Sequence, residues 1–274
     1  MLDPKTILIA TTASTATLLA MSLAGPPSNG PQDATQEDKL GYQNSPLIPG
    51  TQWHVHDGLR PQPTVVSPGD SLGMAPSDAT ILFDGTDLAA FEGGPWALED
   101  GIMTVNGKGD IKTKESFGDC QLHLEWRAPV QEEGQNLRGQ GRHNSGVFFF
   151  GRYEVQILDC YDNQTYPDGM TASLYGQEPP MVNACRPAGQ WQAYDIMFKA
   201  PRFDGDGALL SPAVVTVLLN GVAVQNAQAM TGATQHRKLA SYSQHAEKGP
   251  IKLQDHGNPV SFRNIWVRPL LRAE

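Results

Sequence analysis

The sequence predicts an all-β sandwich, and three observations carry this prediction. Glycine (28) and proline (21) are abundant, which favours many turns and little helix. From Ala79 onward, short apolar runs are separated by Gly, Asp, Asn and Pro, as in β-sandwiches. No stretch longer than about ten residues has a 3.6-residue apolar period. We therefore expect one β-sandwich domain over residues 79–272.

The N-terminal residues predict an exported protein. Lys5 precedes an uncharged stretch, residues 6–24, which ends in Ser22-Leu-Ala24 before Gly25. This is the pattern of a signal peptide, here residues 1–24, cleaved after Ala24. The alternative is an uncleaved anchor, which the many Thr, Ser and Ala residues disfavour. We expect a periplasmic or extracellular protein with no stable membrane span after cleavage.

Residues 25–78 predict a linker followed by an extended segment. The linker, to about residue 45, is rich in Pro, Gln, Asn and Asp and has no apolar period. The extended segment contains Trp53-His-Val-His-Asp57, in which His54 and His56 share one strand face. A metal site there would need a third ligand, so hydrogen-bonded packing is the favoured interpretation.

Charge and cysteine usage exclude some classes of partner. The net charge of −9 and the pI near 5.2 argue against nucleic acid and anionic membranes. The cysteines, Cys120, Cys160 and Cys185, show no CxxC spacing, so a structural zinc site is not indicated. Cys120 fits a buried thiol, and a Cys160–Cys185 disulfide is compatible with an exported protein.

Alternation and turn signals predict the individual strands. Asp100-Gly101 and Asn220-Gly221 are hairpin signals. Residues 121–127 alternate cleanly, with Leu122, Leu124 and Trp126 on the apolar face. In chain order, strands are predicted at 80–83, 96–99, 102–105, 121–127, two within 144–159 joined near Gly151, then 194–198, 214–219, 222–224, 251–254 and 260–267.

The strand that begins at Tyr153 is predicted to carry the functional groups. Glu154 and Gln156 share one face. The other face carries Tyr153, Val155 and Ile157. Regular alternation would bury Asp159 in the core, but a β-bulge near Ile157 or Leu158 would aim it back beside Glu154 and Gln156. Such a row of polar groups suits sugar hydroxyls, a cation or acid/base work.

Two long loops flank this strand pair. Residues 129–143 lead into Asn144, and residues 160–190 follow Asp159. Loops of this length in a compact domain are typically binding loops or lids. We therefore expect the polar sheet face to be a bounded cleft.

At this point several motifs together resemble one known family. They include Ile81-Leu-Phe-Asp-Gly-Thr-Asp-Leu88, Leu122-His-Leu-Glu-Trp-Arg127, Asn144-Ser-Gly-Val147, Tyr153-Glu-Val-Gln-Ile-Leu-Asp159, Trp191-Gln-Ala-Tyr-Asp-Ile196 and the segment from Gly249 to Val267. In their order and spacing they resemble the 3-keto-disaccharide hydrolase family. The resemblance covers about residues 79–270, and it implies a concanavalin A-like jelly roll.

The resemblance also implies cleavage of glycosides whose sugar is oxidised at C3. The ketone acidifies the C2–H, so a base can remove that proton and the enolate can expel the C1 oxygen. Addition of water then completes a net hydrolysis. Such a site needs a base of near-neutral pKa, a positive group near the enolate oxygen and an acid for the leaving group.

The base preferred from the sequence is His256, in a turn between two strands, because an imidazole titrates near neutral pH. Glu154 and Asp159 are the further catalytic candidates, and they are also candidates to bind a divalent cation. The alternative for both acids is a salt bridge to Arg127, which is itself a candidate to stabilise the enolate. The substrate-binding candidates are Arg127, Asn144, Gln156, Tyr175, Asn183, Trp191 and Asp255.

Other functions remain open from the sequence. The same face would serve a non-catalytic, lectin-like carbohydrate-binding module. Glu154-x-Gln-x-x-Asp159 also has the spacing of the Glu-x-Asp-x-x-Glu strand motif of jelly-roll β-glucanases. Here an amide replaces the central acid, which disfavours the glucanase. In each case the expected partner is a carbohydrate.

Overall fold

The computed structural model describes residues 40–270, which fall into two compact units divided between Gln62 and Pro63. The predicted signal peptide and the first part of the linker lie outside the described residues. In the smaller unit, isolated bridges join Gly41 to Asp57 and Leu47 to His54. Among the described residues, no helix has both the length and the hydropathy needed to span a membrane.

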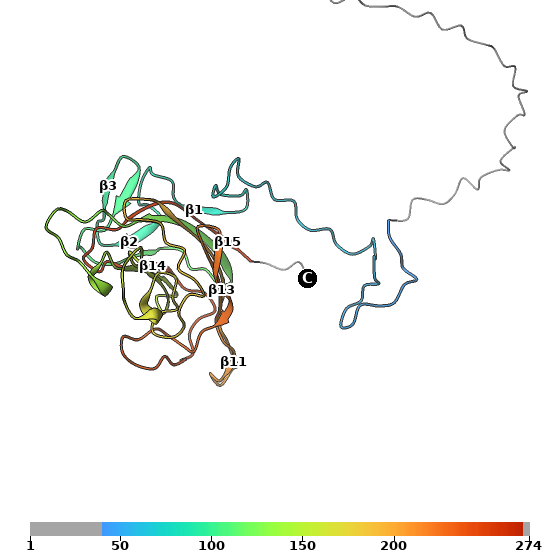
Figure 1. The fold of residues 1–274 in the computed structure, drawn as a ribbon. Coiled ribbons are helices and arrows are strands. Elements are labelled where there is room, and N and C mark those ends of the chain that lie inside the picture. Colours follow the sequence, from blue (N-terminus) through green and yellow to red (C-terminus); the bar gives the residue numbers. More distant parts are fainter. Residues whose placement is uncertain (1–39, 271–274) are drawn as a thin grey trace, which may run out of the picture. The chain divides into compact units, whose positions relative to one another are not determined.

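The larger unit is built from antiparallel sheets, which confirms the predicted all-β class (Figure 1). The larger sheet has eight strands in the order β13-β12-β9-β6-β15-β4-β3, with β1 paired to β15. Its strands are β1 (Thr80–Phe83), β3 (Ala97–Glu99), β4 (Ile102–Thr104), β6 (Cys120–Arg127), β9 (Gln192–Lys199), β12 (Val214–Leu219), β13 (Val222–Ala229) and β15 (Ser261–Pro269).

The smaller sheet has five strands in the order β2-β5-β14-β7-β8. They are β2 (Phe91–Gly93), β5 (Ile111–Thr113), β14 (Ile251–Leu253), β7 (Ser145–Phe149) and β8 (Tyr153–Ile157). A separate ribbon pairs β10 (Arg202–Phe203) with β11 (Leu209–Ser211), and the loops contain the 3₁₀ turns η1 (Gly139–Gly141) and η2 (Pro167–Gly169).

The Asn-Gly hairpin signal is confirmed by the backbone. Asn220 and Gly221 join β12 to β13 with φ values of 55° and 81°. Both residues therefore occupy the left-handed region that a two-residue hairpin of type I′ requires. Asp100 and Gly101 do the same between β3 and β4, with φ values of 50° and 73°.

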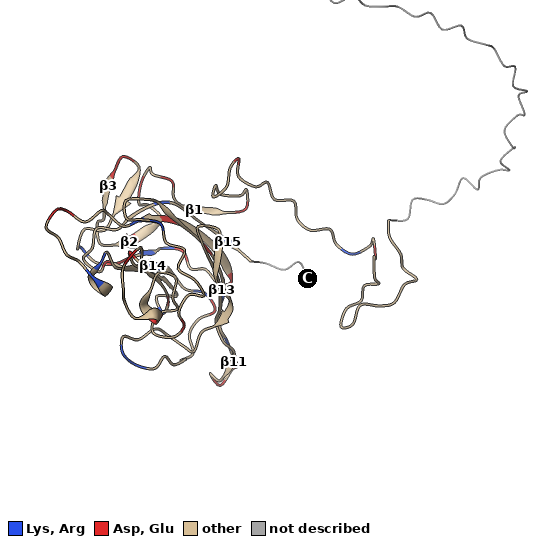
Figure 2. Cartoon of the chain, in the orientation of Figure 1, with Lys and Arg blue, Asp and Glu red and all other residues tan. Residues whose placement is uncertain are grey.

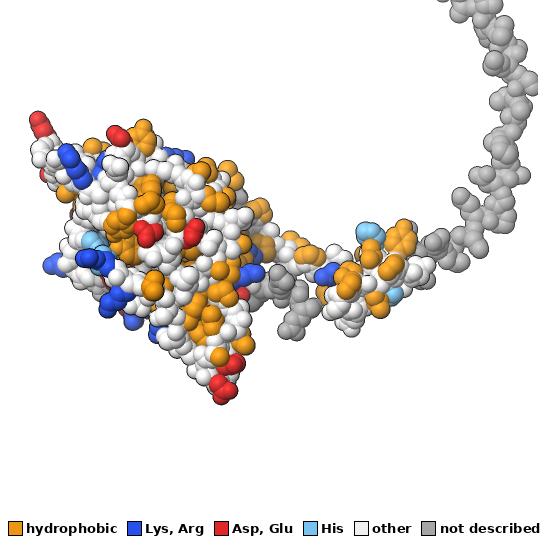
Figure 3. Space-filling view, turned by 60° about the horizontal axis from the view of Figure 1, so that its bottom comes forward, with side chains coloured by type: hydrophobic (Ala, Val, Ile, Leu, Met, Phe, Trp, Pro, Cys, Tyr) orange, Lys and Arg blue, Asp and Glu red, His pale blue; other side chains and the backbone are white. Residues whose placement is uncertain are grey.

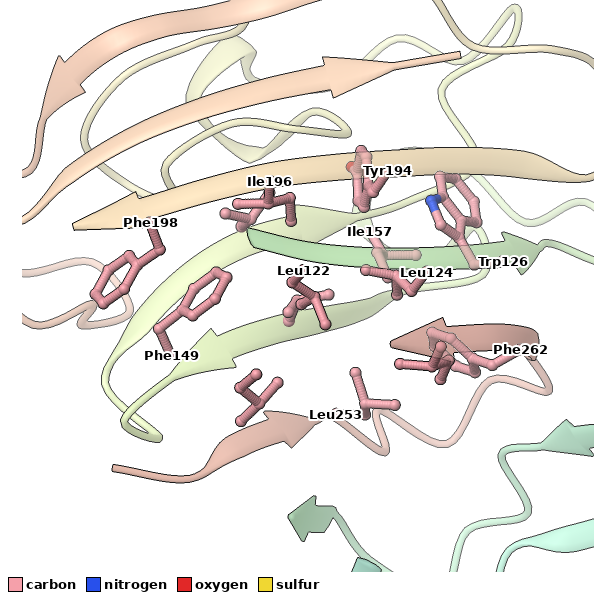
Figure 4. Packing of buried hydrophobic residues seen from close by; sticks show 14 of the residues in the cluster. Leu122, Leu124, Trp126, Phe149, Ile157, Tyr194, Ile196, Phe198, Leu253 and Phe262 are labelled. Carbon is pink, nitrogen blue, oxygen red and sulfur yellow. The ribbon is translucent and has the colours of Figure 1, made fainter. Parts of the chain in front are cut away.

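The core lies between the two sheets. Leu122 and Leu124 on β6 and Ile196 on β9 are fully buried there, together with Ile157 of the smaller sheet (Figure 4). Val155 of the smaller sheet belongs to the same buried cluster. Each of these residues follows the period of two along its strand, which places alternate side chains on the same face. The predicted apolar faces of β6 and β8 are therefore confirmed.

The outward face of β8 is also covered, which the alternation did not indicate. Glu154 is 4% exposed and Gln156 is 1% exposed, because loops from elsewhere in the chain lie over them. The predicted β-bulge does not occur within β8, because β7 and β8 pair without a register shift from Ser145–Ile157 to Phe149–Tyr153. The loop cover turns the sheet face into an enclosed site.

Candidate functional site

A cavity of about 320 Å³ lies over the outward face of β7 and β8. Its floor is the end of the five-stranded sheet, and its walls come from loops distant in sequence. The lining residues are Asn144, Phe148, Glu154, Gln156, Tyr175, Thr234, His236, Gln254 and His256. The predicted cleft therefore exists, and it gathers Asn144, Glu154, Gln156, Tyr175 and His256 of the candidates named from the sequence.

Gly146 on β7 leaves room in the cavity floor for the side chain of Glu154. A Cβ at Gly146 would lie 2.7 Å from Glu154 Oε1 and 3.0 Å from the ring of Phe148. Real Cβ contacts are almost never shorter than 3.0 Å. The absence of a side chain at this position leaves the space that the carboxyl of Glu154 occupies.

Glu154 is the most perturbed acid in the cavity. Burial raises the pKa of its carboxyl to about 8; the charge of Lys252 opposes this shift, and the charge of Asp110 adds to it. No hydrogen bond among the described residues contributes to the shift. A carboxyl that is desolvated but unpartnered favours its protonated form, so it releases its proton near neutral pH. This combination suits a general acid or base.

A cation, an aromatic ring and the acid lie in one row across the sheet. Lys252 on β14 pairs with Phe148 on β7, which pairs with Glu154 on β8. The Nζ of Lys252 is 4.0 Å from the centroid of the Phe148 ring and 2.8 Å from Asp110 Oδ2. Lys252 thus brings positive charge near Glu154 while its own contacts keep it beside the cavity.

Gln140, which sequence analysis missed, orients the two amides of the cavity. Its Oε1 accepts hydrogen bonds from Asn144 Nδ2 at 3.2 Å and from Gln156 Nε2 at 3.1 Å. Its own Nε2 donates to Thr165 Oγ1 at 2.9 Å and to Gly169 O at 2.8 Å. Every polar atom of this side chain therefore has a partner, and Gln140 ties both long loops to the strand pair.

Tyr175 and His236 form the wall between this cavity and a second one. Tyr175 Oη lies 3.0 Å from His236 Nδ1 and 2.8 Å from Tyr166 Oη. Burial, and then the bond to Tyr166, raises the pKa of Tyr175. The second cavity has a volume of about 550 Å³ and is lined by Tyr166, Asp168, Tyr175, Gly176, Gln235, His236, Arg237, Lys238 and Leu239.

Asp159 is placed differently from the sequence expectation. It is buried in an ion pair with Arg142, with 2.7 Å between Oδ2 and Nε, and it does not line the cavity of Glu154. Without the predicted bulge, the chain carries Asp159 into the loop beyond β8. Within residues 40–270, no group of three or more His, Cys, Asp or Glu side chains is placed to hold a metal. Glu154 and Asp159 therefore do not fit a shared cation site.

Arg127 ends β6 of the larger sheet and Trp191 directly precedes β9, and neither residue lines either of these two cavities. The guanidinium carbon of Arg127 is 4.7 Å from the centroid of the Trp191 ring, and that of Arg263 is 4.2 Å away. The ring is thus engaged by two cations. Because Glu154 and Asp159 belong to the other sheet and its loop, neither acid forms the alternative salt bridge to Arg127, and the observed pair is Arg142–Asp159.

The last two candidates support loops. Asn183 donates from Nδ2 to Cys160 O at 2.9 Å, and its Oδ1 accepts from Cys185 N at 3.1 Å. Asp255 accepts from Gly109 N at 3.0 Å and from Gly257 N at 2.8 Å, which fixes the turn that presents His256. Cys160 and Cys185 are both free thiols in the structure, so the disulfide between them is not formed.

One face of the larger unit mixes apolar and charged side chains. Figure 3 shows acidic side chains set among hydrophobic ones on the face that its view brings forward, with Lys, Arg and His side chains along one margin. The residues that sequence analysis missed, such as Thr234 and His236, come from the loop between β13 and β14. Their segment has no strand period and no spaced motif, so the sequence carries no signal for them.

Comparison with known proteins places the chain in a family. Residues 78–268 match the 3-keto-alpha-glucoside-1,2-lyase-like domain. A Bacteroides thetaiotaomicron protein named 3-keto-disaccharide hydrolase is 26% identical in an alignment 248 residues long that covers 73% of this chain and 82% of that protein.

Solved structures agree with this assignment. A Parabacteroides distasonis protein, described as a candidate glycosyl hydrolase, is 44% identical, with a TM-score of 0.74 over 82% of this chain and 100% of its own. A second one from the same organism, at 22% identity and a TM-score of 0.51 over 70% of this chain and 99% of its own, shares the fold. The chain belongs to the family of 3-keto-alpha-glucoside-1,2-lyase-like proteins.

Proposed function

We propose that this protein cleaves the glycosidic bond of sugars oxidised at C3, through proton abstraction at C2, elimination and hydration. Family membership and the name of the Bacteroides relative support the substrate class. The observation that carries the proposal is the buried carboxyl of Glu154, whose pKa of about 8 suits removal of a proton from carbon next to a ketone.

Glu154 is the proposed base. The ketone at C3 acidifies the C2–H bond, and the proton passes from C2 to a carboxylate oxygen of Glu154. The sequence favoured His256 for this role, but His256 is exposed at the rim of the cavity, whereas Glu154 lies on its floor. A base that is shielded from water transfers a proton without first shedding a hydration shell.

The developing enolate needs positive charge and hydrogen-bond donors near the C3 oxygen. We assign this role to His256 at the cavity rim, aided by the charge of Lys252 beside Phe148. The amide groups of Asn144 and Gln156, oriented by Gln140, are suited to hold the sugar hydroxyls. No step in this scheme requires Asp159.

Departure of the leaving group needs a proton donor at C1. Tyr175 and His236 are hydrogen-bonded to each other and line both cavities, so the scissile bond is proposed to lie between them and Glu154. As the C1–O bond breaks, its two electrons go to the leaving oxygen, which takes a proton from the hydrogen-bonded Tyr175 and His236. Water then adds its oxygen to C1, C2 regains a proton from Glu154, and the proton released by water restores the donor pair. The net reaction is hydrolysis.

The experiment compares a 3-keto-glucoside with its unoxidised parent, each with and without chelator. We expect release of the leaving group from the keto sugar alone, at the same rate with chelator. A chelator-sensitive rate would show that a divalent cation takes part. Cleavage of the parent alone would support the glucanase, and binding without cleavage would support the lectin-like module.

Replacement of Glu154 provides the matched test of the assigned base. Glu154→Gln keeps the size of the side chain but cannot accept the proton, so we expect kcat to fall by about 10³-fold or more. Glu99→Gln, on the exposed end of β3, is the control and should leave kcat unchanged. Retention of kcat in the Glu154 variant would overturn the assignment.

A further inference from the structure

Two basic side chains line the second cavity, whereas no Lys or Arg of residues 40–270 lines the first. Arg237 and Lys238 both line it and are exposed, and neither forms an ion pair with an acid in the described part of the chain. Asp168 is the one carboxylate among the lining residues. Figure 2 shows basic residues on this loop between β13 and β14. The cavity is thus locally cationic in a chain with a net charge of −9.

The same cavity also offers a surface for a ring. Tyr166 and Tyr175 meet edge to face with 6.3 Å between their ring centroids, and the Tyr175 ring stacks on His236. Leu239, 94% exposed, adds an apolar side chain to the lining. A ligand that covered this leucine would gain binding free energy by removing its apolar surface from water. With a volume of about 550 Å³, the cavity is within the size range of small-molecule sites.

We propose that this second cavity binds the leaving group of the substrate, and that it selects leaving groups with an anionic substituent such as a carboxylate. The inference rests on the proposed function, which places the bond to be broken at the wall formed by Tyr175 and His236. A ring linked to C1 would then extend over Tyr175 and Leu239. Its anionic substituent would meet Arg237 and Lys238, which attract it more strongly than Asp168 alone repels it.

The test uses two 3-keto-glucosides that differ in charge and little in size, one of 4-hydroxybenzoate and one of its methyl ester. The ester is the better leaving group, because it withdraws electrons more strongly than the carboxylate. Chemical reactivity alone therefore favours the ester. We expect kcat/KM to favour the carboxylate by about two- to fivefold for each cation at low salt. This preference should decline as ionic strength rises.

Variants identify the residues responsible. Arg237→Gln and Lys238→Gln should each reduce the preference about two- to fivefold, mainly by raising KM for the carboxylate substrate, with KM for the ester unchanged. Lys199→Gln, at the exposed end of β9, is the matched control and should alter neither. Equal use of both substrates, or a preference that the double variant retains, would overturn the inference while leaving the proposed function intact.

A binding measurement separates the two proposals. If neither glycoside is cleaved, the proposed function fails, and binding of free 4-hydroxybenzoate to the full chain decides the inference. We then expect binding by the unaltered protein that weakens about fourfold or more in the Arg237→Gln, Lys238→Gln double variant. Absence of binding, or equal affinity in the double variant, would overturn it.

Discussion

Gly146 on β7 pairs with Gln156 on β8 and is a diagonal neighbour of Glu154, and a Cβ on Gly146 would come within 2.7 Å of Glu154 Oε1. Alanine should be compatible with the backbone of Gly146, because this residue is not among those with positive φ. Gly146→Ala should therefore fold, but its methyl group should displace the carboxyl of Glu154. We expect kcat/KM on a 3-keto-glucoside to fall about tenfold or more.

The control for this variant is Gly205→Ala, where a new Cβ would meet no atom within 4 Å. It should leave kcat/KM unchanged. An active Gly146→Ala protein with unaltered kinetics would show that the carboxyl position does not matter.

The rate should depend on pH through Glu154. Only the carboxylate form accepts a proton, so kcat/KM should rise with pH and reach half its maximum near 8, where the pKa of Glu154 lies. Lys252→Gln removes a charge that lowers this pKa, so the midpoint should move to higher pH. Lys112→Gln, on the next strand of the same row, pairs with the exposed Glu92 and is the control. If the midpoint of the pH profile is the same in Lys252→Gln and in the unaltered protein, the assignment of Glu154 as the base is contradicted.

The raised pKa of Glu154 that suits catalysis should also lower the stability of the folded protein at high pH. Glu154 has an ordinary pKa of 4.5 and a folded pKa of about 8, so between these values the folded protein keeps a proton that the unfolded chain has released. The free energy of unfolding therefore falls as pH rises from about 4.5 to about 8, and the full penalty persists above that range. Glu154→Gln stays neutral and avoids this penalty.

We accordingly expect Glu154→Gln to be more stable than the unaltered protein at pH about 9, by up to about 5 kcal/mol, with little difference at pH about 4. Denaturant unfolding at both pH values measures this. The exposed Glu99→Gln should show no such pH-dependent gain. An equal difference at both pH values would mean that the amide acts through packing alone.

Local rules were sufficient for much of the fold. Alternation in β6 and β8 and the Asn220-Gly221 turn depend on neighbouring residues, and the structure confirms them. The predicted position of Asp159 depended on a β-bulge that β8 does not have. The direction of the side chains beyond the end of a strand depends on their tertiary partners, and for Asp159 that partner is Arg142. The sequence does not encode that partner in any spacing.

The candidate site was predictable where it lies on strands and unpredictable where loops complete it. Glu154 and Gln156 follow from the period of two. His236 and Gln140 enter the site from loops that cross the sheet face, and long-range closure of that kind has no periodic signal. Burial by those same loops raises the pKa of Glu154. Because this burial has no signal in the sequence, the sequence offers no reason to prefer Glu154 to His256 as the base.

Gln140 should act as a positioning residue through Asn144 and Gln156. Gln140→Met keeps a side chain of similar length but leaves both amides without their shared acceptor. We expect a loss of about 1–3 kcal/mol in the free energy of unfolding. On a 3-keto-glucoside we expect a fall of about tenfold in kcat/KM, because the sugar hydroxyls meet misoriented donors.

Gln131→Met is the matched control, since Gln131 is in the same loop and bonds only to the backbone of Leu137 within the described residues. It should cost stability without a specific loss of activity. Comparison at a temperature where both variants are fully folded separates the two effects. If both variants then lose activity equally, Gln140 acts by holding the loop and not by orienting the amides.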